Sequence, residues 1–217
     1  VAKKIKQLEP AFDPKHYGHD TAKAVLCSTH LGPCLGHVAA ATVFGENNPA
    51  GRTPTTWYRS VRDLPALDDY DIAKNHVTYL YFRGKPLYAF GYGLSYTTFE
   101  YSNLTLDKSK MKDTDTLTVS VNVRNTGKVK GKEVVQLYVG MPESHTIRPI
   151  KELRGFEKIE LEPGEEKTVT FTLAKRAFAY YRTDISDWYV ESGDYTIMAA
   201  KSSRDIACTA TVNVTST

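Results

Sequence analysis

The chain has 217 residues, of which 41% are hydrophobic and 24% are charged, and its formal net charge is +3. The length suits one large domain, or one sandwich of about 100 residues with a second piece, and the composition excludes an intrinsically disordered chain. The basic residues are dispersed, with Lys3, Lys4 and Lys6 as the densest cluster, and long apolar runs are absent, so we expect neither nucleic acid nor a membrane as a partner.

The first 58 residues contain the pattern of the end of an α/β unit. Ala24–Cys27 is a short apolar run typical of a buried strand, and His37–Phe44 is Ala-rich and predicts a short helix ended by Gly45. Asn48–Gly51 predicts a turn, and Thr53–Tyr58 predicts a second short strand. Two strands and a helix cannot enclose a core, so we expect this segment to be covered by something outside it.

Cysteines and histidines near this segment do not form a recognisable metal motif. Cys27 and Cys34 are followed three residues later by His30 and His37, so a metal site can be drawn, but no second Cys or His pair stands at zinc spacing. With Cys208 the chain has three cysteines, too few for a disulfide framework. We interpret Cys27 and Cys34 as a buried small residue and a loop residue, and we expect no metal and no cofactor.

Residues 59–98 form a long connection rich in Asp, Tyr and Gly. Such a stretch is unusual inside a compact domain, so it is either functional or laid across a neighbouring domain. Its dense aromatic side chains favour burial against adjoining domains, and a sugar-stacking rim is the alternative. We call residues 59–98 the strap.

From Phe99 onward the sequence predicts β-structure. Leu117–Arg124 alternates strictly between apolar and polar residues, so one face of this strand is expected to be buried. About seven such strands about ten residues apart are typical of an immunoglobulin-like sandwich, with Ala174–Tyr181 as a single helical turn between sheets. Tyr138, Trp188 and Tyr180–Tyr181 are expected in core-like places. The other predicted strands are Val134–Val139, Phe156–Leu161, Lys167–Leu173, Trp188–Val190, Tyr195–Ala199 and Ile206–Val214.

Seven segments resemble, in order and spacing, the C-terminal part of family 3 glycoside hydrolases. The resemblance covers about residues 21–215 and implies a mainly β fold, in which a fibronectin type III-like (immunoglobulin-like) β-sandwich follows a partial α/β-sandwich segment. The expected division is 1–58 for the α/β remnant, 59–98 for the strap and 99–217 for the β-sandwich. The segments are Asn48–Trp57, Gly84–Phe99, Asn125–Gly127, Gly131–Val139, Lys151–Phe156, Leu161–Glu165 and Ser202–Asp205.

The resemblance implies the chemistry of retaining glycosidases that act on β-linked sugars. That chemistry needs two carboxylates about 5–5.5 Å apart. In the family an Asp of the upstream barrel domain is the nucleophile and a Glu of the second domain is the acid/base, and neither has a counterpart here. We therefore expect no catalytic residue in this chain. Gly32-Pro33-Cys34 stands where the family usually has Gly-Gln-Glu, which removes a carboxylate near the sugar pocket.

Weak candidates for a substrate rim lie on the strap. Asp68-Asp69-Tyr70 resembles the bacterial β-glucosidase and β-xylosidase branch of the family, and Arg83 follows on the same segment. An alternative makes Asp68, Asp69 and Asp71, or Glu46, catalytic carboxylates of this chain. Clustered Asp residues in a loop are more often turn formers, so we favour the structural interpretation.

The sequence leaves three alternative functions open. The first is a structural C-terminal part of a family 3 enzyme, inactive alone, that hydrolyses β-linked glucosides or xylosides when complete. Its partners would be an upstream catalytic barrel, in cis or as a separate chain, and a β-linked oligosaccharide. The second is a free-standing carbohydrate-binding or cell-surface module, and the third is an enzyme with its carboxylates inside this chain. Because the chain begins with Val1, a processed or excised part is expected, with a secreted or periplasmic location favoured over a cytoplasmic one.

Overall fold

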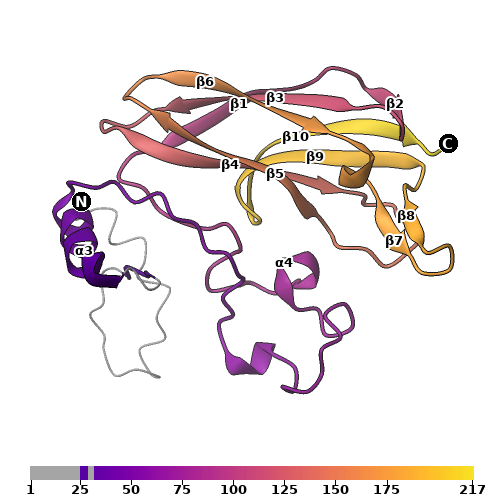
Figure 1. Cartoon of the computed structure of the whole chain (residues 1–217), viewed down its shortest axis with the longest axis horizontal. Coiled ribbons are helices and arrows are strands. Elements are labelled where there is room, and N and C mark those ends of the chain that lie inside the picture. The colour runs from indigo at the N-terminus through magenta and orange to yellow at the C-terminus, as the bar shows by residue number, and fades with distance from the viewer. Residues whose placement is uncertain (1–24, 29–31) are drawn as a thin grey trace.

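Two packed β-sheets form the main body of the computed structural model, which describes residues 25–28 and 32–217 (Figure 1). One sheet has three strands in the order β1-β3-β6, and the other has five in the order β2-β10-β9-β4-β5. The prediction of a mainly β, fibronectin type III-like sandwich is therefore confirmed. The strands are β1 (Phe99–Leu106), β2 (Lys110–Lys112), β3 (Leu117–Asn125), β4 (Gly131–Gly140), β5 (Glu152–Leu161), β6 (Glu166–Leu173), β9 (Gly193–Ser202) and β10 (Asp205–Thr215).

The core lies between the sheets because apolar residues alternate along the strands. On β3, Leu117, Val119, Val121 and Val123 are fully buried, while the residues between them are not. This is the period-two pattern that the sequence predicts, since successive side chains of a strand point to opposite faces. The facing sheet contributes Val135, Leu137, Tyr195, Ile197, Ala199, Val212 and Val214.

Turn residues fix the strand ends. Asn125 is fully buried and its amide donates to the carbonyls of Val129 (2.9 Å) and Leu161 (3.1 Å). The predicted turn at Glu162-Pro163-Gly164 is confirmed, because Glu165 N donates to Glu162 O at 3.0 Å and Gly164 has φ of 80°. The predicted helical turn is the 3₁₀-helix η4 (Lys175–Ala177).

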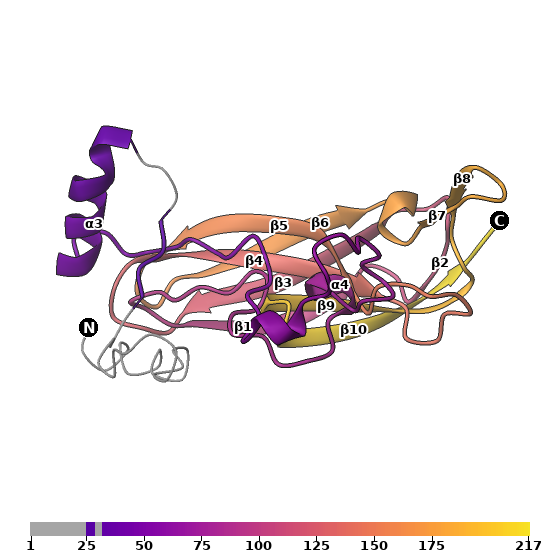
Figure 2. The same ribbon diagram turned by 90° about the horizontal axis from the view of Figure 1, so that it is seen from below.

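The helix α3 (Leu35–Phe44) follows the 3₁₀-helix η2 (Gly32–Cys34) and confirms the predicted helix. Gly45 ends it in the left-handed conformation, with φ of 84°. Figure 2 shows α3 standing beside the sandwich rather than packed on either sheet. The predicted buried strand Ala24–Cys27 is wrong where it is described: residues 25–27 are irregular and exposed, and Ala24 lies outside the described residues. An apolar run forms a buried strand only beside neighbouring strands, and within the described part of the chain no strand pairs with residues 25–28.

Residues 48–58 also differ from the prediction. Asn48–Gly51 is irregular rather than a turn, and Thr53–Tyr58 forms one isolated bridge, Trp57 with Tyr88, instead of a strand in a sheet. The backbone of this segment pairs with the strap: Thr53 N donates to Tyr92 O at 2.8 Å, and Trp57 N donates to Tyr88 O at 2.9 Å. The pairing makes residues 53–58 part of a two-chain ribbon with the end of the strap.

The strap crosses the outer face of the five-stranded sheet (Figure 2). It carries the 3₁₀-helix η3 (Val61–Asp63) and the helix α4 (Thr78–Tyr81). Beneath it, Gln136 and Tyr138 on the outer face of β4 are almost wholly buried, as are the core-facing residues of the same strand. Tyr79 of the strap joins the two layers. Its ring stacks on that of Phe90, with centroids 4.2 Å apart, and meets that of Tyr138 on β4 edge-on at 6.1 Å. From Val135 to Gly140, β4 is therefore buried on both faces, whereas Lys132 before it is exposed.

The hairpin of β7 (Tyr180–Arg182) and β8 (Asp187–Tyr189) extends from the end of the sandwich opposite α3 (Figure 1). The expectation of core-like places holds for Tyr138, which is fully buried, but not for Tyr181 and Trp188, which are 49% and 37% exposed. The short strands project beyond the sheets, so their outward side chains meet solvent. No described helix is both long and apolar enough to cross a bilayer.

Candidate functional site

The predicted rim residues Asp68, Asp69 and Tyr70 follow one another at a turn that begins a projecting loop of the strap, residues 67–78, with Tyr70 directly after the turn. Asp69 N donates to Ala66 O at 3.0 Å, which closes the turn. The Asp69 carboxylate accepts from the backbone N of Asp71 at 3.2 Å and pairs with Lys74 Nζ at 3.2 Å. The hydrogen bond from Asp71 is the largest cause that lowers the pKa of Asp69 below its usual value. Asp69 is thus a negatively charged brace of the loop.

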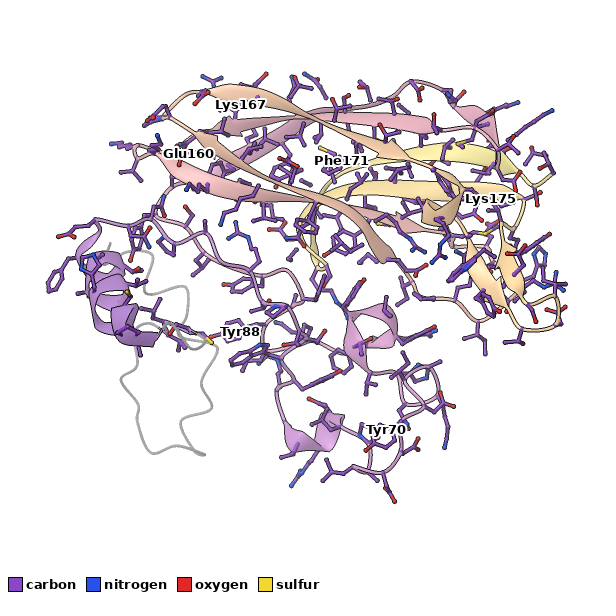
Figure 3. All side chains as sticks on the ribbon, in the orientation of Figure 1. Tyr70, Tyr88, Glu160, Lys167, Phe171 and Lys175 are labelled. Carbon is purple, nitrogen blue, oxygen red and sulfur yellow. The ribbon has the colours of Figure 1, made fainter. Side chains whose placement is uncertain are left out.

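Tyr70 is presented to solvent by this brace. Its side chain is 85% exposed. Figure 3 shows it at the end of the strap that lies farthest from the sheets. A tyrosine ring combines an apolar face with a hydrogen-bonding hydroxyl, which suits contact with a sugar ring. The turn therefore fixes the base of an exposed aromatic side chain.

The end of the same loop carries backbone strain. His76 and Thr78 have positive φ values of 52° and 60°, which are rare for residues other than glycine and most unusual for a β-branched residue. Thr78 N donates to the hydroxyl of Tyr58 at 2.7 Å, and Val77 N donates to Ile72 O at 3.1 Å. Strain of this kind persists where surrounding contacts enforce it, and it concentrates at binding and catalytic sites.

Arg83, the fourth predicted rim residue, lies after α4 and is exposed. Within residues 25–28 and 32–217, no hydrogen bond or ion pair joins it to Asp68, Asp69 or Tyr70. The structure therefore brings three of the four candidates together and places Arg83 on a separate part of the strap.

The carboxylates of Asp69 and Asp71 are engaged in turn formation. Asp71 Oδ1 accepts from Lys74 N at 2.9 Å, as Asp69 accepts from Asp71. These bonds match the interpretation of the Asp cluster as turn formers. Over the described part of the chain, His, Cys, Asp and Glu side chains form no group of three or more suited to a metal ion. His30, named in the drawn metal site, lies outside the described residues, and Cys27 and Cys34 are both exposed, contrary to the expectation of a buried small residue.

A row of aromatic rings lies on the ribbon side of the strap. Trp57 meets Tyr88 edge-on at 5.7 Å between centroids, and Tyr88 stacks on Tyr92 at 5.3 Å. Trp57 is 38% exposed, and Figure 3 shows Tyr88 on the side of the strap facing α3. The aromatic density of the strap is the sequence signal for this row, but its pairing with Trp57 depends on the ribbon and was not predicted.

Polar side chains meet where the strap joins the sandwich. A cavity of about 240 Å³ lies there, and its walls include Arg52, Tyr92, Glu133, Lys201 and Asp205. Arg52 Nη2 and Glu133 Oε2 are 2.8 Å apart, and both side chains are largely buried. The two cations and two carboxylates balance in charge, so the cavity favours neither an anion nor a cation.

Two family models match the chain in succession. The glycosyl hydrolase family 3 C-terminal domain matches residues 8–96, and the fibronectin type III-like domain matches residues 133–203. The first match includes α3 and almost all of the strap, and the second lies inside the sandwich.

Individual relatives match almost the whole chain. It is 49% identical over 209 residues to thermostable beta-glucosidase B of Acetivibrio thermocellus, covering 91% of this chain and 28% of that protein. It is 39% identical over 202 residues to an exo-alpha-(1->6)-L-arabinopyranosidase of Bifidobacterium breve, covering 88% and 26%. The crystal structure of a Bifidobacterium adolescentis GH3 beta-glucosidase superposes with a TM-score of 0.75 at 35% identity, covering 82% of this chain and 28% of that one. The chain thus spans little more than a quarter of the length of these relatives.

Proposed function

Because the chain belongs to family 3 of the glycoside hydrolases and matches the C-terminal part of its members, we propose that it supports the sugar-binding domains of such an enzyme and is inactive alone. In this proposal the complete enzyme hydrolyses β-linked glucosides or xylosides. The nucleophile and the acid/base come from the upstream barrel and α/β domains, in cis or as a separate chain.

The observation that carries this proposal is the uncovered apolar surface of α3. Leu35, Val38, Val43 and Phe44 are 45%, 37%, 58% and 82% exposed. A helix that is apolar on several sides is normally buried, and an exposed apolar patch marks an interaction surface. We propose that the upstream domains cover α3 and the aromatic row of the strap, with residues 1–58 completing their α/β layer and residues 99–217 forming the sandwich domain.

The test compares two proteins on the same substrates. The 217-residue chain is assayed on nitrophenyl β-glucoside and β-xyloside, beside a protein in which this chain follows its upstream domains. We expect turnover only from the longer protein. Turnover by the purified chain would overturn the proposal, because it would require carboxylates within the chain.

Within the complete enzyme we propose that the loop 67–78 and Arg83 line the rim of the substrate pocket. Support comes from the exposed, braced Tyr70 and from the strained backbone at His76 and Thr78. The chain matches both a glucosidase and an arabinopyranosidase, at 49% and 39% identity. We infer that this C-terminal part does not by itself determine which sugar the enzyme accepts. Tyr70→Ala should therefore raise KM for several glycosides alike, and an unchanged KM would remove Tyr70 from the rim.

A second candidate function is carbohydrate binding by the β7–β8 hairpin, since Tyr181 and Trp188 are exposed there. Their rings meet at an interplanar angle of 67°, and Arg176 covers one face of Trp188. They form no planar platform, so we rank this candidate below the structural role. Affinity electrophoresis in xylan, cellulose derivatives and β-glucan decides: retardation lost in Trp188→Ala but kept in Phe156→Ala, which removes another exposed ring, would establish it.

A further inference from the structure

The tip of the β9–β10 hairpin, Ser202-Ser203-Arg204-Asp205, has a fixed shape. Ser202 is 3% exposed, and its hydroxyl accepts from the backbone N of Arg204 (3.3 Å) and of Asp205 (3.0 Å). A serine that binds the backbone two and three residues ahead holds a tight turn. The tip is an extension of the five-stranded sheet, so whatever it binds takes its position from the sandwich.

This tip binds the strap at three backbone carbonyls. Arg204 Nη2 donates to Phe82 O and to Gly84 O, the latter at 3.1 Å, and Ser203 N donates to Phe90 O at 2.9 Å. The two carbonyls bound by Arg204 belong to the residues on either side of Arg83. A guanidinium is always charged, and its Nη2 carries two N–H groups, so this one nitrogen of Arg204 binds both carbonyls.

Phe82 transmits this attachment to the loop 67–78. Its side chain is 9% exposed and meets the ring of Tyr58 edge-on at 5.0 Å. The Tyr58 hydroxyl in turn accepts from Thr78 N at 2.7 Å, at the strained start of α4. Gly84 lies so close to Phe82 that an added Cβ would stand 2.6 Å from its ring. A continuous set of contacts thus runs from Arg204 to the end of the loop.

We propose that Arg204 is a positioning residue for the substrate rim, so that the sandwich sets the placement of Arg83 and of the loop 67–78. This inference rests on the proposed function, because it assigns the rim to the complete enzyme. It gives the sandwich a part in substrate affinity beyond passive support. A purely structural attachment would instead affect unfolding and leave substrate affinity unchanged.

The attachment itself is tested on the 217-residue chain by amide hydrogen exchange. Arg204→Ala should raise exchange in residues 78–92 by about tenfold or more, because bonds from a charged donor are lost. Exchange in β3 and β6 should stay unchanged. Arg204→Lys, which offers one compact donor group, should give an intermediate increase. Arg182→Ala, which removes a half-buried arginine of the distant hairpin, is the matched control. Unchanged exchange in residues 78–92 of Arg204→Ala would overturn the inference.

The consequence for the rim is tested in the complete enzyme with the same three variants. Arg204→Ala should raise KM about tenfold and change kcat less than about twofold, with Arg204→Lys in between. A fall of about tenfold in kcat with KM unchanged, or no change in either constant, would overturn the positioning role while leaving the proposed function intact. Absence of activity in the unaltered complete enzyme would instead overturn the proposed function, and the exchange result would still decide whether Arg204 holds the strap.

Discussion

Arg52 and Glu133 form a nearly buried ion pair across 81 residues of sequence, with Nη2 and Oε2 2.8 Å apart. The Tyr101 hydroxyl donates to the other oxygen of Glu133 at 2.9 Å. Burial raises the pKa of Glu133, and the neighbouring Arg52 and Tyr101 oppose that rise. The pair joins the segment before the strap to β4 of the sandwich, so its integrity reports on their docking.

Replacing Arg52 by Met should destabilise the chain by about 3–5 kcal/mol at pH 8, because Glu133 is left buried without its cation. The folded-state pKa of Glu133 lies above the usual 4.5 and rises further in this variant. The stability contribution of a raised carboxyl is present at low pH and lost as pH rises through the folded pKa. The deficit measured by urea unfolding should therefore shrink toward pH 4.5. An equal deficit at both pH values would contradict this account.

Gly91→Ala should loosen the strap. Gly91 has φ of 79°, and an added Cβ would stand 2.0 Å from Gln136 Oε1, whose amide group donates to Gly91 O at 3.0 Å. Gly164→Ala is a matched control, because Gly164 has φ of 80° and open space around its Cβ position. The control should cost about 1–2 kcal/mol from the left-handed backbone alone. Gly91→Ala should lower the free energy of unfolding, measured with urea, clearly more than the control does. Equal losses in the two variants would mean that the strap moves to accommodate the added Cβ at no energetic cost.

Glu191→Gln should lower stability only at neutral pH. Burial opposes ionisation of Glu191, but hydrogen bonds from His145 N (2.8 Å), Ser144 Oγ (2.7 Å) and the His145 ring (2.6 Å) outweigh it and hold the pKa below 4.5. A lowered carboxyl pKa contributes stability above the unfolded value and loses it as pH falls through the folded value. The expected loss is about 1–2 kcal/mol at pH 7. This loss of unfolding free energy should become smaller below pH 4.5. The control Glu157→Gln, at an exposed glutamate, should show no such loss at either pH.

Phe44→Glu should reduce self-association of the isolated chain. Phe44 is 82% exposed at the end of an apolar helix, so α3 offers a surface for contact between copies when its proposed cover is absent. Sedimentation velocity over a concentration series gives the measurement. Phe156→Glu, which changes a ring that is 67% exposed on the sandwich, is the control. A similar effect of both variants would mean that α3 has no special role in association.

The sandwich was predictable because its strands carry their own signal. Along β3 the alternation of Leu117, Val119, Val121 and Val123 with polar residues determines both the strand and its buried face. The short run at Ala24–Cys27 was misinterpreted because a buried strand needs neighbouring strands, and none of the described strands pairs with residues 25–28. Trp188 was placed wrongly because residue type alone cannot tell a sheet strand from a projecting hairpin.

The candidate site was predictable only in part. Asp68, Asp69 and Tyr70 are adjacent in sequence, so their placement together could be expected. The attachment of Arg204 to the carbonyls beside Arg83 spans more than 100 residues and uses backbone atoms, which leave no pattern in side-chain types. The segment Ser202–Asp205 is one of those that resemble the family, but its residue types do not indicate that it contacts the strap.

The burial of β4 on both faces has a consequence for gene fusion and recombination. A crossover placed at residue 98, the sequence boundary before the sandwich, would give Gln136 and Tyr138 a foreign strap and break the fit between Gly91 and Gln136. A crossover upstream of Asn48 keeps the strap, Arg52 and Glu133 together, since Asn48 itself donates to Lys130 O at 2.9 Å. Chimeras of family members should therefore inherit residues 48–217 as one block.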